Sequence, residues 1–398
     1  MVRSRFEVRQ EEYLNKIRQS LNKAEEIVIY GAGNIGKSLF KLLKDNGINV
    51  QAFCVTEAKS NLEEIYGVPV CSLKKTVRNN SNNKLFILGA IPPNNIEMIE
   101  MLRMYGITNY IDAERDMRHI FDVVSNRPTL EITSRIGCSV NCKLCPQSVL
   151  LNIYDVRKRA SVLSFETFKR CLDKTPKNLI VDFAGFAEPF LNPDIISMME
   201  YAIRSNRDVR LFTTLVGMTE AVFSKMIKLP FYRVVLHLPD EHSYSQIPLT
   251  KEYYSFLERI ISARKPNGSR FVDKANSQSK PHYSVLPYIE NKTIVHQVLV
   301  DWAGNIKSDE VHSSPVKHGK LICDYSVDLN HNILLPDGTV VLCCMDWKNS
   351  CVLGNLLVDS YEDIVYGDRK KAICNELNSS IGNEGFICRR CTNSIEME

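Results

Sequence analysis

The feature that most constrains this chain is a group of three cysteines in Cys138-Ser-Val-Asn-Cys142-Lys-Leu-Cys145, which comes just after the alternating run 130–133. Three thiolates in one short loop can hold three corners of a [4Fe–4S] cube and leave the fourth iron open to another ligand. The alternative is a structural zinc site. Such a site usually needs four ligands, and no fourth cysteine or histidine lies near this loop. The spacing therefore favours a cluster with one open iron.

The bulk properties of the chain narrow the class of protein. Its 398 residues are enough for two or three domains, and 44% hydrophobic with 24% charged residues is typical of a soluble globular protein. The net charge of +4 gives no reason to expect a nucleic acid partner, and the absence of long apolar runs predicts no membrane span. Thirteen cysteines without a signal-peptide core predict a cytoplasmic protein that uses clustered cysteines for metal or redox chemistry.

Residues 1–125 predict a Rossmann-like α/β module. The strand 26–30 leads into Gly31-Ala32-Gly33-Asn34-Ile35-Gly36, and a helix and a second strand at 49–54 follow. In this context Gly31, Gly33 and Gly36 would allow a tight turn that turns the helix amino terminus toward a phosphate. The segment is similar to small modules of surface-polysaccharide and sugar-modifying proteins. Two interpretations stay open, a site for a nucleotide or nucleotide sugar and a structural or docking module.

Residues 126–310 predict a partial, open β/α barrel with six strands. Strands are expected at 130–134, 178–184, 208–214, 232–238, 282–288 and 295–300. Helices are expected at 164–174, 195–205, 220–229 and 251–263, and the polar stretch 268–280 is expected to be a flexible loop. A connecting helix at 113–124 and a linker at 125–128 should precede the barrel. In such barrels the chemistry lies at the carboxyl ends of the strands.

The spacing of Cys138, Cys142 and Cys145 resembles the signature of the radical S-adenosylmethionine (SAM) enzymes. The resemblance implies that the open iron chelates the amino and carboxylate groups of SAM, and that reduction of the cluster cleaves SAM to a 5′-deoxyadenosyl radical. Leu144 departs from the family, which usually has an aromatic residue before the third cysteine. The resemblance also implies that an electron-donor protein, such as flavodoxin or ferredoxin, supplies the electron.

The same resemblance assigns a segment after the second strand to SAM. Gly185-Phe-Ala-Glu188 resembles the family's "GGE" segment, with Ala187 in place of a glycine, and Gly185 and Glu188 are expected to receive the SAM amino group. Thr213 and Thr214 end the third strand, where the family has contacts to the ribose.

Two further candidates lie at the end of the fourth strand. His237 and Asp240 are expected at the barrel mouth, where they could bind SAM or substrate. A hydrogen-bonded buried histidine is an equally good interpretation of His237.

Residues 311–398 resemble the SPASM domain, the auxiliary-cluster extension of many radical SAM enzymes. The resemblance rests on Cys323, on Gly338-x4-Cys343 and on a terminal Cys388-x2-Cys391. Four cysteines would fully ligate one auxiliary [4Fe–4S] cluster, although they would suit a zinc ribbon as well. The central cysteine block of the full pattern is absent, which favours the shortened "twitch" form. Cys344 is expected to point to the opposite side of its strand.

These features together predict a radical SAM oxidoreductase that abstracts hydrogen from a substrate C–H bond. The expected reaction is dehydrogenation of a sugar, sugar nucleotide or aminocyclitol, with the auxiliary cluster as electron acceptor. One alternative is a radical SAM maturase that modifies a peptide. Another, from a different class, is a non-catalytic nucleotide-binding scaffold with degenerate clusters.

Overall fold

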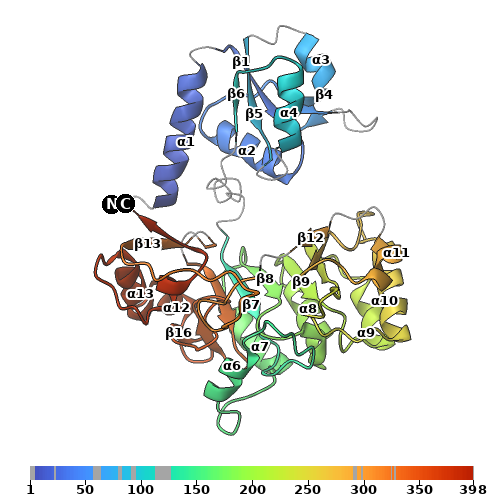
Figure 1. The fold of residues 1–398 in the computed structure, drawn as a ribbon, viewed down its shortest axis with the longest axis vertical. Helices are drawn as coiled ribbons and strands as arrows, with labels where there is room; N and C mark the ends of the chain where they lie inside the picture. The colour runs from blue at the N-terminus through green and yellow to red at the C-terminus, as the bar shows by residue number, and fades with distance from the viewer. Residues whose placement is uncertain are drawn as a thin grey trace. The chain divides into compact units, whose positions relative to one another are not determined.

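The computed structural model forms two compact units, Met1–Asn126 and Arg127–Glu398 (Figure 1). It describes residues 5–21, 24–56, 64–78, 83–90, 96–112, 127–289, 294–296, 299–323, 325–326 and 329–397. The expected connecting helix at 113–124 lies outside the described residues. Among the described helices, none combines the length and the apolar character that a bilayer crossing needs.

The first unit is built on a six-stranded sheet in the order β3-β4-β2-β1-β5-β6. Its strands are β1 (Glu26–Tyr30), β2 (Ala52–Val55), β3 (Glu64–Ile65), β4 (Val68–Ser72), β5 (Lys84–Leu88) and β6 (Tyr110–Ile111). Its helices are α1 (Arg5–Leu21), α2 (Asn34–Asp45), α3 (Leu73–Arg78) and α4 (Ile96–Met104). Every strand pair is parallel except β3 with β4, so this segment has the alternating α/β character that its sequence predicts.

Both faces of this sheet are covered, as a parallel sheet requires. Ile27 and Ile29 of β1 pack into one buried cluster with apolar residues of α1 and α2. The alternate side chains, Val28 and Tyr30, pack into a second cluster with residues of α3 and α4. The near-continuous apolar run of β1 is therefore the signature of a strand that is buried on both sides.

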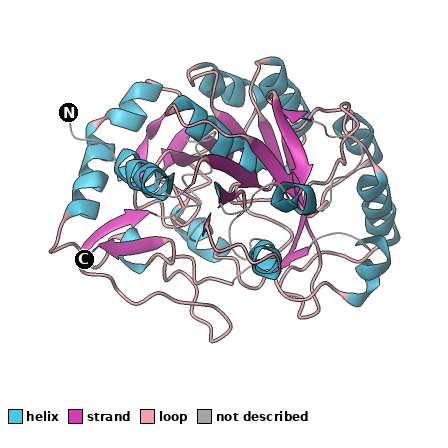
Figure 2. Cartoon of the chain, turned by 90° about the horizontal axis from the view of Figure 1, so that it is seen from above, coloured by secondary structure: helices cyan, strands magenta, loops and turns pink. Residues whose placement is uncertain are grey.

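The second unit is built on a nine-stranded sheet in the order β12-β11-β10-β9-β8-β7-β14-β15-β16. Six of these strands are successive and parallel: β7 (Thr129–Ile132), β8 (Ile180–Phe183), β9 (Val209–Thr213), β10 (Arg233–His237), β11 (Lys274–Ser277) and β12 (Ile294–His296). The helices are α6 (Gln147–Ile153), α7 (Phe165–Asp173), α8 (Ile195–Arg204), α9 (Glu220–Met226), α10 (Lys251–Ser262) and α11 (Leu286–Ile289), and they lie around the strands (Figure 2). Because the strand order does not close on itself, the barrel is open, as predicted.

The helices of the barrel begin at polar caps. Ser164, Thr219 and Thr250 each accept a hydrogen bond from the backbone N–H three residues further on, at the starts of α7, α9 and α10. Such caps satisfy one of the N–H groups that the first helical turn leaves without a partner. Apolar side chains of these helices then pack on the outward side chains of the strands in one large core.

The fifth strand of the barrel differs from the prediction. It lies at Lys274–Ser277, inside the stretch expected to be a flexible loop, and the expected strand 282–288 is instead the 3₁₀ helix η5 (Tyr283–Val285) followed by α11. The prediction was wrong because β11 carries one outward apolar side chain, Ala275, and otherwise polar residues. Because Ser277, on the same face as Ala275, is polar, and both residues on the other face are polar too, β11 shows no apolar alternation.

The carboxyl-terminal segment extends the barrel sheet. β14 (His331–Leu334) pairs in parallel with β7, and β15 (Thr339–Val341) and β16 (Val352–Asn355) continue the sheet in antiparallel fashion. Asp337 and Gly338 form the turn between β14 and β15, which confirms the predicted hairpin. A separate pair, β13 (Lys320–Cys323) with β17 (Ser394–Met397), and the helices α12 (Tyr361–Tyr366) and α13 (Asp368–Asn378) complete the unit. This shared sheet explains why residues 127–398 form one unit.

Candidate metal and cofactor sites

A tight loop after β7 holds the first group of cysteines. Gly137 and Asn141 have positive φ angles of 87° and 52°, so the chain turns sharply on both sides of Cys138. The backbone N–H of Cys145 donates to the carbonyl oxygen of Cys142 at 3.3 Å. The three cysteines therefore project from one compact loop at the carboxyl-terminal edge of the parallel strands.

The three thiols are partly buried and form no disulfide. Burial raises the pKa of Cys142 to about 11 and that of Cys145 to about 12, and the charge of Cys138 acts on both in the same direction. Burial also raises the pKa of Cys138. Thiols that are neutral, close together and not joined in disulfides can release their protons to a metal. The donor set therefore fits a cluster held by three sulfur ligands.

Glu188 follows the second barrel strand, β8, and contacts the cysteine loop. Its backbone N–H donates to Sγ of Cys138 at 3.5 Å. Its buried carboxylate accepts hydrogen bonds from Oγ1 of Thr213 at 2.6 Å and from both the N–H and Oγ1 of Thr214 at 2.7 Å. Burial raises the pKa of Glu188, and the bonds from the two threonines oppose that shift. The structure thus brings together four of the residues that the sequence assigns to the cluster and SAM.

Gly185 has a packing role of its own. Its φ angle is +57°, and a Cβ at this position would lie 2.6 Å from Oγ1 of Thr133 and 2.7 Å from the carbonyl oxygen of Ile132. The next residue, Phe186, donates its N–H to the same Thr133 hydroxyl at 3.1 Å. Glycine is therefore required here for the turn to sit against β7. This requirement positions the segment that ends in Glu188.

His237 and Asp240 have different environments. Burial, aided by the charge of Lys274, lowers the pKa of His237 to about 4, so this side chain is neutral at pH 7. Asp240 is 1% exposed. Its carboxylate accepts hydrogen bonds from the backbone N–H groups of His242, Tyr244 and Ser245 and from the hydroxyls of Ser245 and Ser279. Asp240 therefore stabilises its own loop. The same loop contacts the cysteine loop, because the N–H of Lys143, between the second and third cysteines, donates to the carbonyl oxygen of Tyr244 at 2.8 Å.

The second group of cysteines comes together in the carboxyl-terminal segment. Cys323 ends β13, Cys343 follows β15, and Cys388 and Cys391 lie in and just after the 3₁₀ helix η6 (Ile387–Arg390). The charge of Cys323 acts on both Cys343 and Cys388, and the charge of Cys391 acts on Cys388. Burial raises the pKa of Cys343 and Cys388 well above the usual range. Four thiols from three separate segments, gathered in this way, fit a fully ligated cluster.

Cys344 has charged neighbours both in the barrel and among these cysteines, and the charge of Glu131 on β7 acts most strongly on its thiol. The charges of Cys391 and Cys323 act on the Cys344 thiol, which also shares a hydrogen bond with Tyr325. The alternation rule does not apply here because β15 ends at Val341. The expectation that Cys344 points away from the cluster cysteines therefore stays a prediction.

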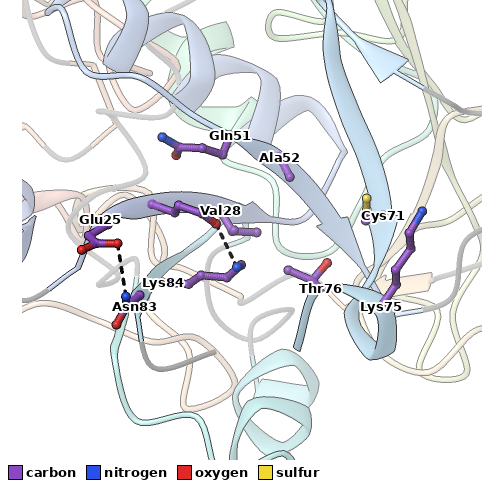
Figure 3. A pocket seen from close by; sticks show the side chains of 10 residues that line it. Glu25, Val28, Gln51, Ala52, Cys71, Lys75, Thr76, Asn83 and Lys84 are labelled. Atoms are coloured by element: carbon purple, nitrogen blue, oxygen red, sulfur yellow. Dashed lines mark hydrogen bonds and ion pairs between the residues drawn. The ribbon is translucent and has the colours of Figure 1, made fainter. Parts of the chain in front are cut away.

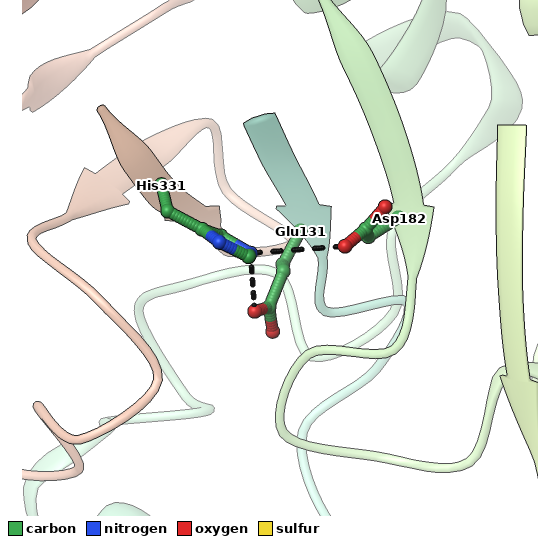
Figure 4. Close-up of side chains that lie close together, drawn as sticks. All are labelled: Glu131, Asp182 and His331. Carbon is green, nitrogen blue, oxygen red and sulfur yellow. Dashed lines mark ion pairs between the residues drawn. The ribbon is translucent and has the colours of Figure 1, made fainter. Parts of the chain in front are cut away.

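A buried group of ionisable side chains also escaped the sequence reasoning (Figure 4). Nε2 of His331 on β14 lies 2.7 Å from Oε1 of Glu131 on β7 and 3.7 Å from Oδ2 of Asp182 on β8. This spacing would suit a metal ion, but Nε and Nη2 of Arg210 on β9 donate to both carboxylate oxygens of Asp182. A guanidinium in that position neutralises the carboxylate and repels a cation. We therefore describe the group as an ion-pair network inside the barrel sheet.

The glycine loop of the first unit is tightly packed. Gly31 has a φ angle of +117°, and a Cβ on Gly36 would lie 1.9 Å from the Gly31 carbonyl oxygen. A Cβ on Gly33 would meet no atom within 4 Å, and α2 begins there without a side-chain cap. Two of the predicted glycines are thus explained by packing. Gly33 is the one that opens onto free space.

A pocket of about 420 Å³ also lies in the first unit (Figure 3). Lys84 and Glu26, which form an ion pair at 2.8 Å, line it together with Gln51 and the hydrogen-bonded pair Glu25 and Asn83. These residues lie at the amino-terminal ends of β1, β2 and β5. Cys71 near the carboxyl-terminal end of β4, and Lys75 and Thr76 on α3, also line it. The residues that line the pocket do not include Gly31, Gly33 or Gly36, so it is not the predicted nucleotide site.

Comparison with protein families supports the assignment of the carboxyl-terminal segment. Residues 323–392 match the SPASM family, which is described as an iron–sulfur cluster-binding domain. The match begins at Cys323 and includes Cys343, Cys388 and Cys391. The chain is also 26% identical over 229 residues to the dual-specificity RNA methyltransferase RlmN of Wigglesworthia glossinidia brevipalpis, a match that covers 54% of this chain and 59% of RlmN. The chain thus spans about six tenths of the length of this relative.

Several solved structures are similar to this chain. BtrN in complex with AdoMet and 2-DOIA is 14% identical with a TM-score of 0.43, and the match covers 63% of this chain and 87% of BtrN. A histidine-tagged form of anSMEcpe with bound AdoMet is 13% identical with a TM-score of 0.41, over 62% of this chain and 79% of that one. Streptococcus suis SuiB bound to the precursor peptide SuiA is 13% identical with a TM-score of 0.39, over 85% and 80%. At these TM-scores the similarities identify no substrate.

Proposed function

We propose that this chain, which is a radical SAM enzyme with a carboxyl-terminal SPASM iron–sulfur domain, oxidises a sugar, sugar nucleotide or aminocyclitol at a C–H bond. The observation that supports the oxidation is the gathering of Cys323, Cys343, Cys388 and Cys391 in the unit that also holds the three-cysteine loop. A cube with four protein ligands has no iron free to bind substrate, but it can take up an electron.

The chain's own residues prepare the SAM site. When bound, SAM and the cluster at Cys138, Cys142 and Cys145 supply a 5′-deoxyadenosyl radical that removes hydrogen from the substrate. Glu188 is the proposed acceptor for the SAM ammonium. Its carboxylate is held in place by the hydroxyls of Thr213 and Thr214. A carboxylate that is already fixed loses little freedom when the ligand binds.

The second half of the reaction must balance electrons and protons. Removal of a hydrogen atom from an alcohol carbon leaves a carbon radical, which becomes a ketone when it loses one electron and one proton. The four cysteines of the SPASM segment provide the proposed site for that electron, and solvent or a neighbouring base takes the proton. The reaction also needs an electron-donor protein, such as flavodoxin or ferredoxin, to start it. A chain that uses its cysteines as cluster ligands rather than in disulfides favours the reducing cytoplasm as its compartment.

A substrate panel tests the proposal. The anaerobically reconstituted chain is incubated with SAM, dithionite and either aminocyclitols and nucleotide sugars or short peptides. We expect 5′-deoxyadenosine in all reactions, and a product two hydrogens lighter in a sugar or aminocyclitol reaction. A lighter or cross-linked peptide with no change in the sugars would replace this proposal by peptide modification. The absence of 5′-deoxyadenosine from every reaction would favour a non-catalytic scaffold.

We further propose that the glycine loop of the first unit binds the phosphate of a nucleotide or nucleotide sugar. Two features favour this. The uncapped start of α2 opens beside Gly33, and the loop follows β1, next to β5, where the strand order of the sheet reverses. Calorimetry with UDP-glucose and with NAD⁺ tests the proposal, with Gly33→Asp as the variant that should lose binding. If neither compound binds the wild-type chain, the structural or docking interpretation is the better one.

A further inference from the structure

A buried arginine fixes the loop that carries the last two cysteines. Arg389 lies between Cys388 and Cys391 in the sequence, and its side chain is 1% exposed. Its guanidinium donates to four carbonyl oxygens, those of Lys317, Gly319, Glu376 and Ser379. The Glu376 carboxylate, 3.9 Å away, offsets its charge. Arg389 therefore fixes this loop to four neighbouring backbone carbonyls, and the Glu376 carboxylate balances its charge.

Lys317 also contacts this loop, through both its backbone and its side chain. Its backbone N–H donates to the carbonyl oxygen of Arg389 at 2.9 Å. Its Nζ donates to the carbonyl oxygen of Cys391 at 2.7 Å and to the hydroxyl of Ser314. These bonds hold the ammonium against the backbone of a cysteine that the SPASM match includes. A lysine on the surface would not be held in this way.

Burial lowers the pKa of Lys317, and the negative groups around its ammonium oppose that shift. The charges of Cys391 and Cys388 act on its ammonium, and so do those of the carboxylates of Glu396 and Asp301. The hydrogen bonds to a carbonyl and a hydroxyl would need only a neutral donor. Placing a charged group in a partly buried site costs free energy by desolvation. The charge of Lys317 therefore calls for an explanation beyond the hydrogen bonds that it makes.

We propose that the Lys317 ammonium sets the reduction potential of the auxiliary cluster. Reduction adds one negative charge to a cluster that thiolate ligands already make negative, and a fixed cation beside those ligands stabilises the reduced form. Removing the cation should therefore make the cluster harder to reduce. The inference rests on the proposed electron-acceptor role, because a more positive potential favours uptake of an electron from the substrate.

The test is a redox titration of the full-length chain in which Cys138, Cys142 and Cys145 are replaced by alanine, so that only the auxiliary cluster remains. The midpoint potential is followed by electron paramagnetic resonance in this background and in four further variants. Lys317→Gln keeps a hydrogen-bond donor and Lys317→Met removes it, and both remove the charge. Lys317→Arg keeps the charge. Lys371→Met removes an exposed lysine that pairs with Asp368 on α13 and serves as the control.

The account predicts that Lys317→Gln and Lys317→Met shift the midpoint to more negative values, whereas Lys317→Arg and Lys371→Met stay near the parent. Equal midpoints in all five proteins would overturn the proposal. If both neutral variants fail to bind iron and Lys317→Arg binds it normally, Lys317 has a structural role instead and the proposal also fails. A parent chain with no auxiliary iron at all would count against the proposed function, which is a separate outcome.

Discussion

Replacing Glu188 by glutamine tests how the chain holds SAM. The change preserves the shape of the side chain but removes the negative charge proposed to face the SAM ammonium. A hydrogen bond to a charged group contributes about 1.5–3 kcal/mol, and about 1.4 kcal/mol corresponds to a tenfold change in Kd. The Kd for SAM should therefore rise roughly 10- to 150-fold in Glu188→Gln.

The structure supplies a matched control for this variant. Thr214 donates to Glu188 through both its N–H and its hydroxyl at 2.7 Å. Thr214→Val removes only the hydroxyl and leaves the carboxylate charged and held by the remaining N–H. Because it loses one neutral donor and no charge, Thr214→Val should raise the Kd by no more than about tenfold.

The assay is anaerobic calorimetry of SAM binding to reconstituted chains with matched iron content and measured Tm. Iron content and Tm must both be measured because the Glu188 N–H also contacts Sγ of Cys138. An unchanged Kd in Glu188→Gln, with iron content and Tm equal to those of the wild type, would refute the placement of the SAM ammonium at Glu188.

Three further predictions follow from the two cysteine groups, a strained glycine and a partly buried histidine. The reconstituted chain should bind about eight irons, and alanine at Cys138, Cys142 and Cys145 should remove about half of them; full iron retention in that variant, or zinc at the carboxyl-terminal cysteines, would contradict the cluster assignment. Gly185→Ala should lower the free energy of unfolding by at least about 1 kcal/mol more than Gly268→Ala. Both glycines have positive φ angles, but of the two only Gly185 has atoms within 3 Å of an added Cβ. Equal losses in chemical denaturation would show that the contact with Thr133 is easily relieved. Burial lowers the pKa of His237 from 6.5 to about 4. Between these two pH values unfolding takes up a proton, so the free energy of unfolding falls as the pH falls. The drop in Tm between about pH 7.5 and 5.5 should therefore be smaller in His237→Gln than in the wild type, and an equal drop would mean that His237 is not held neutral.

Local patterns in the sequence were enough to identify the residues of the proposed SAM site. The cysteine spacing at 138–145 and the acid at Glu188 are local motifs, and Thr213 and Thr214 end an apolar strand. Since the carboxyl ends of parallel strands meet at one edge, the residues at those ends come together once the strands are correctly ordered. The structure brings Cys138, Glu188, Thr213 and Thr214 into contact for this reason.

Features that depend on partners far away in the sequence could not be predicted. His331 reaches Glu131 only because β14 pairs in parallel with β7, and nothing near His331 in the sequence indicates that pairing. β11 was missed because a strand with a single apolar residue, Ala275, gives no apolar alternation. The Lys317 contact with Cys391 spans 74 residues and has no local signal either.

The most direct test of the account uses Cys388→Ala with a substrate identified from the panel. Circular dichroism must first show that the variant is folded, because loss of a cluster can unfold the domain that holds it. The measurement is the ratio of 5′-deoxyadenosine to oxidised product under anaerobic, single-turnover conditions. The account predicts about one product per 5′-deoxyadenosine in the wild type. In Cys388→Ala it predicts 5′-deoxyadenosine that carries substrate hydrogen but almost no oxidised product. A folded variant that lacks the auxiliary cluster and still forms product at the wild-type ratio would contradict the electron-acceptor role, and a redox-neutral reaction would then be the better account.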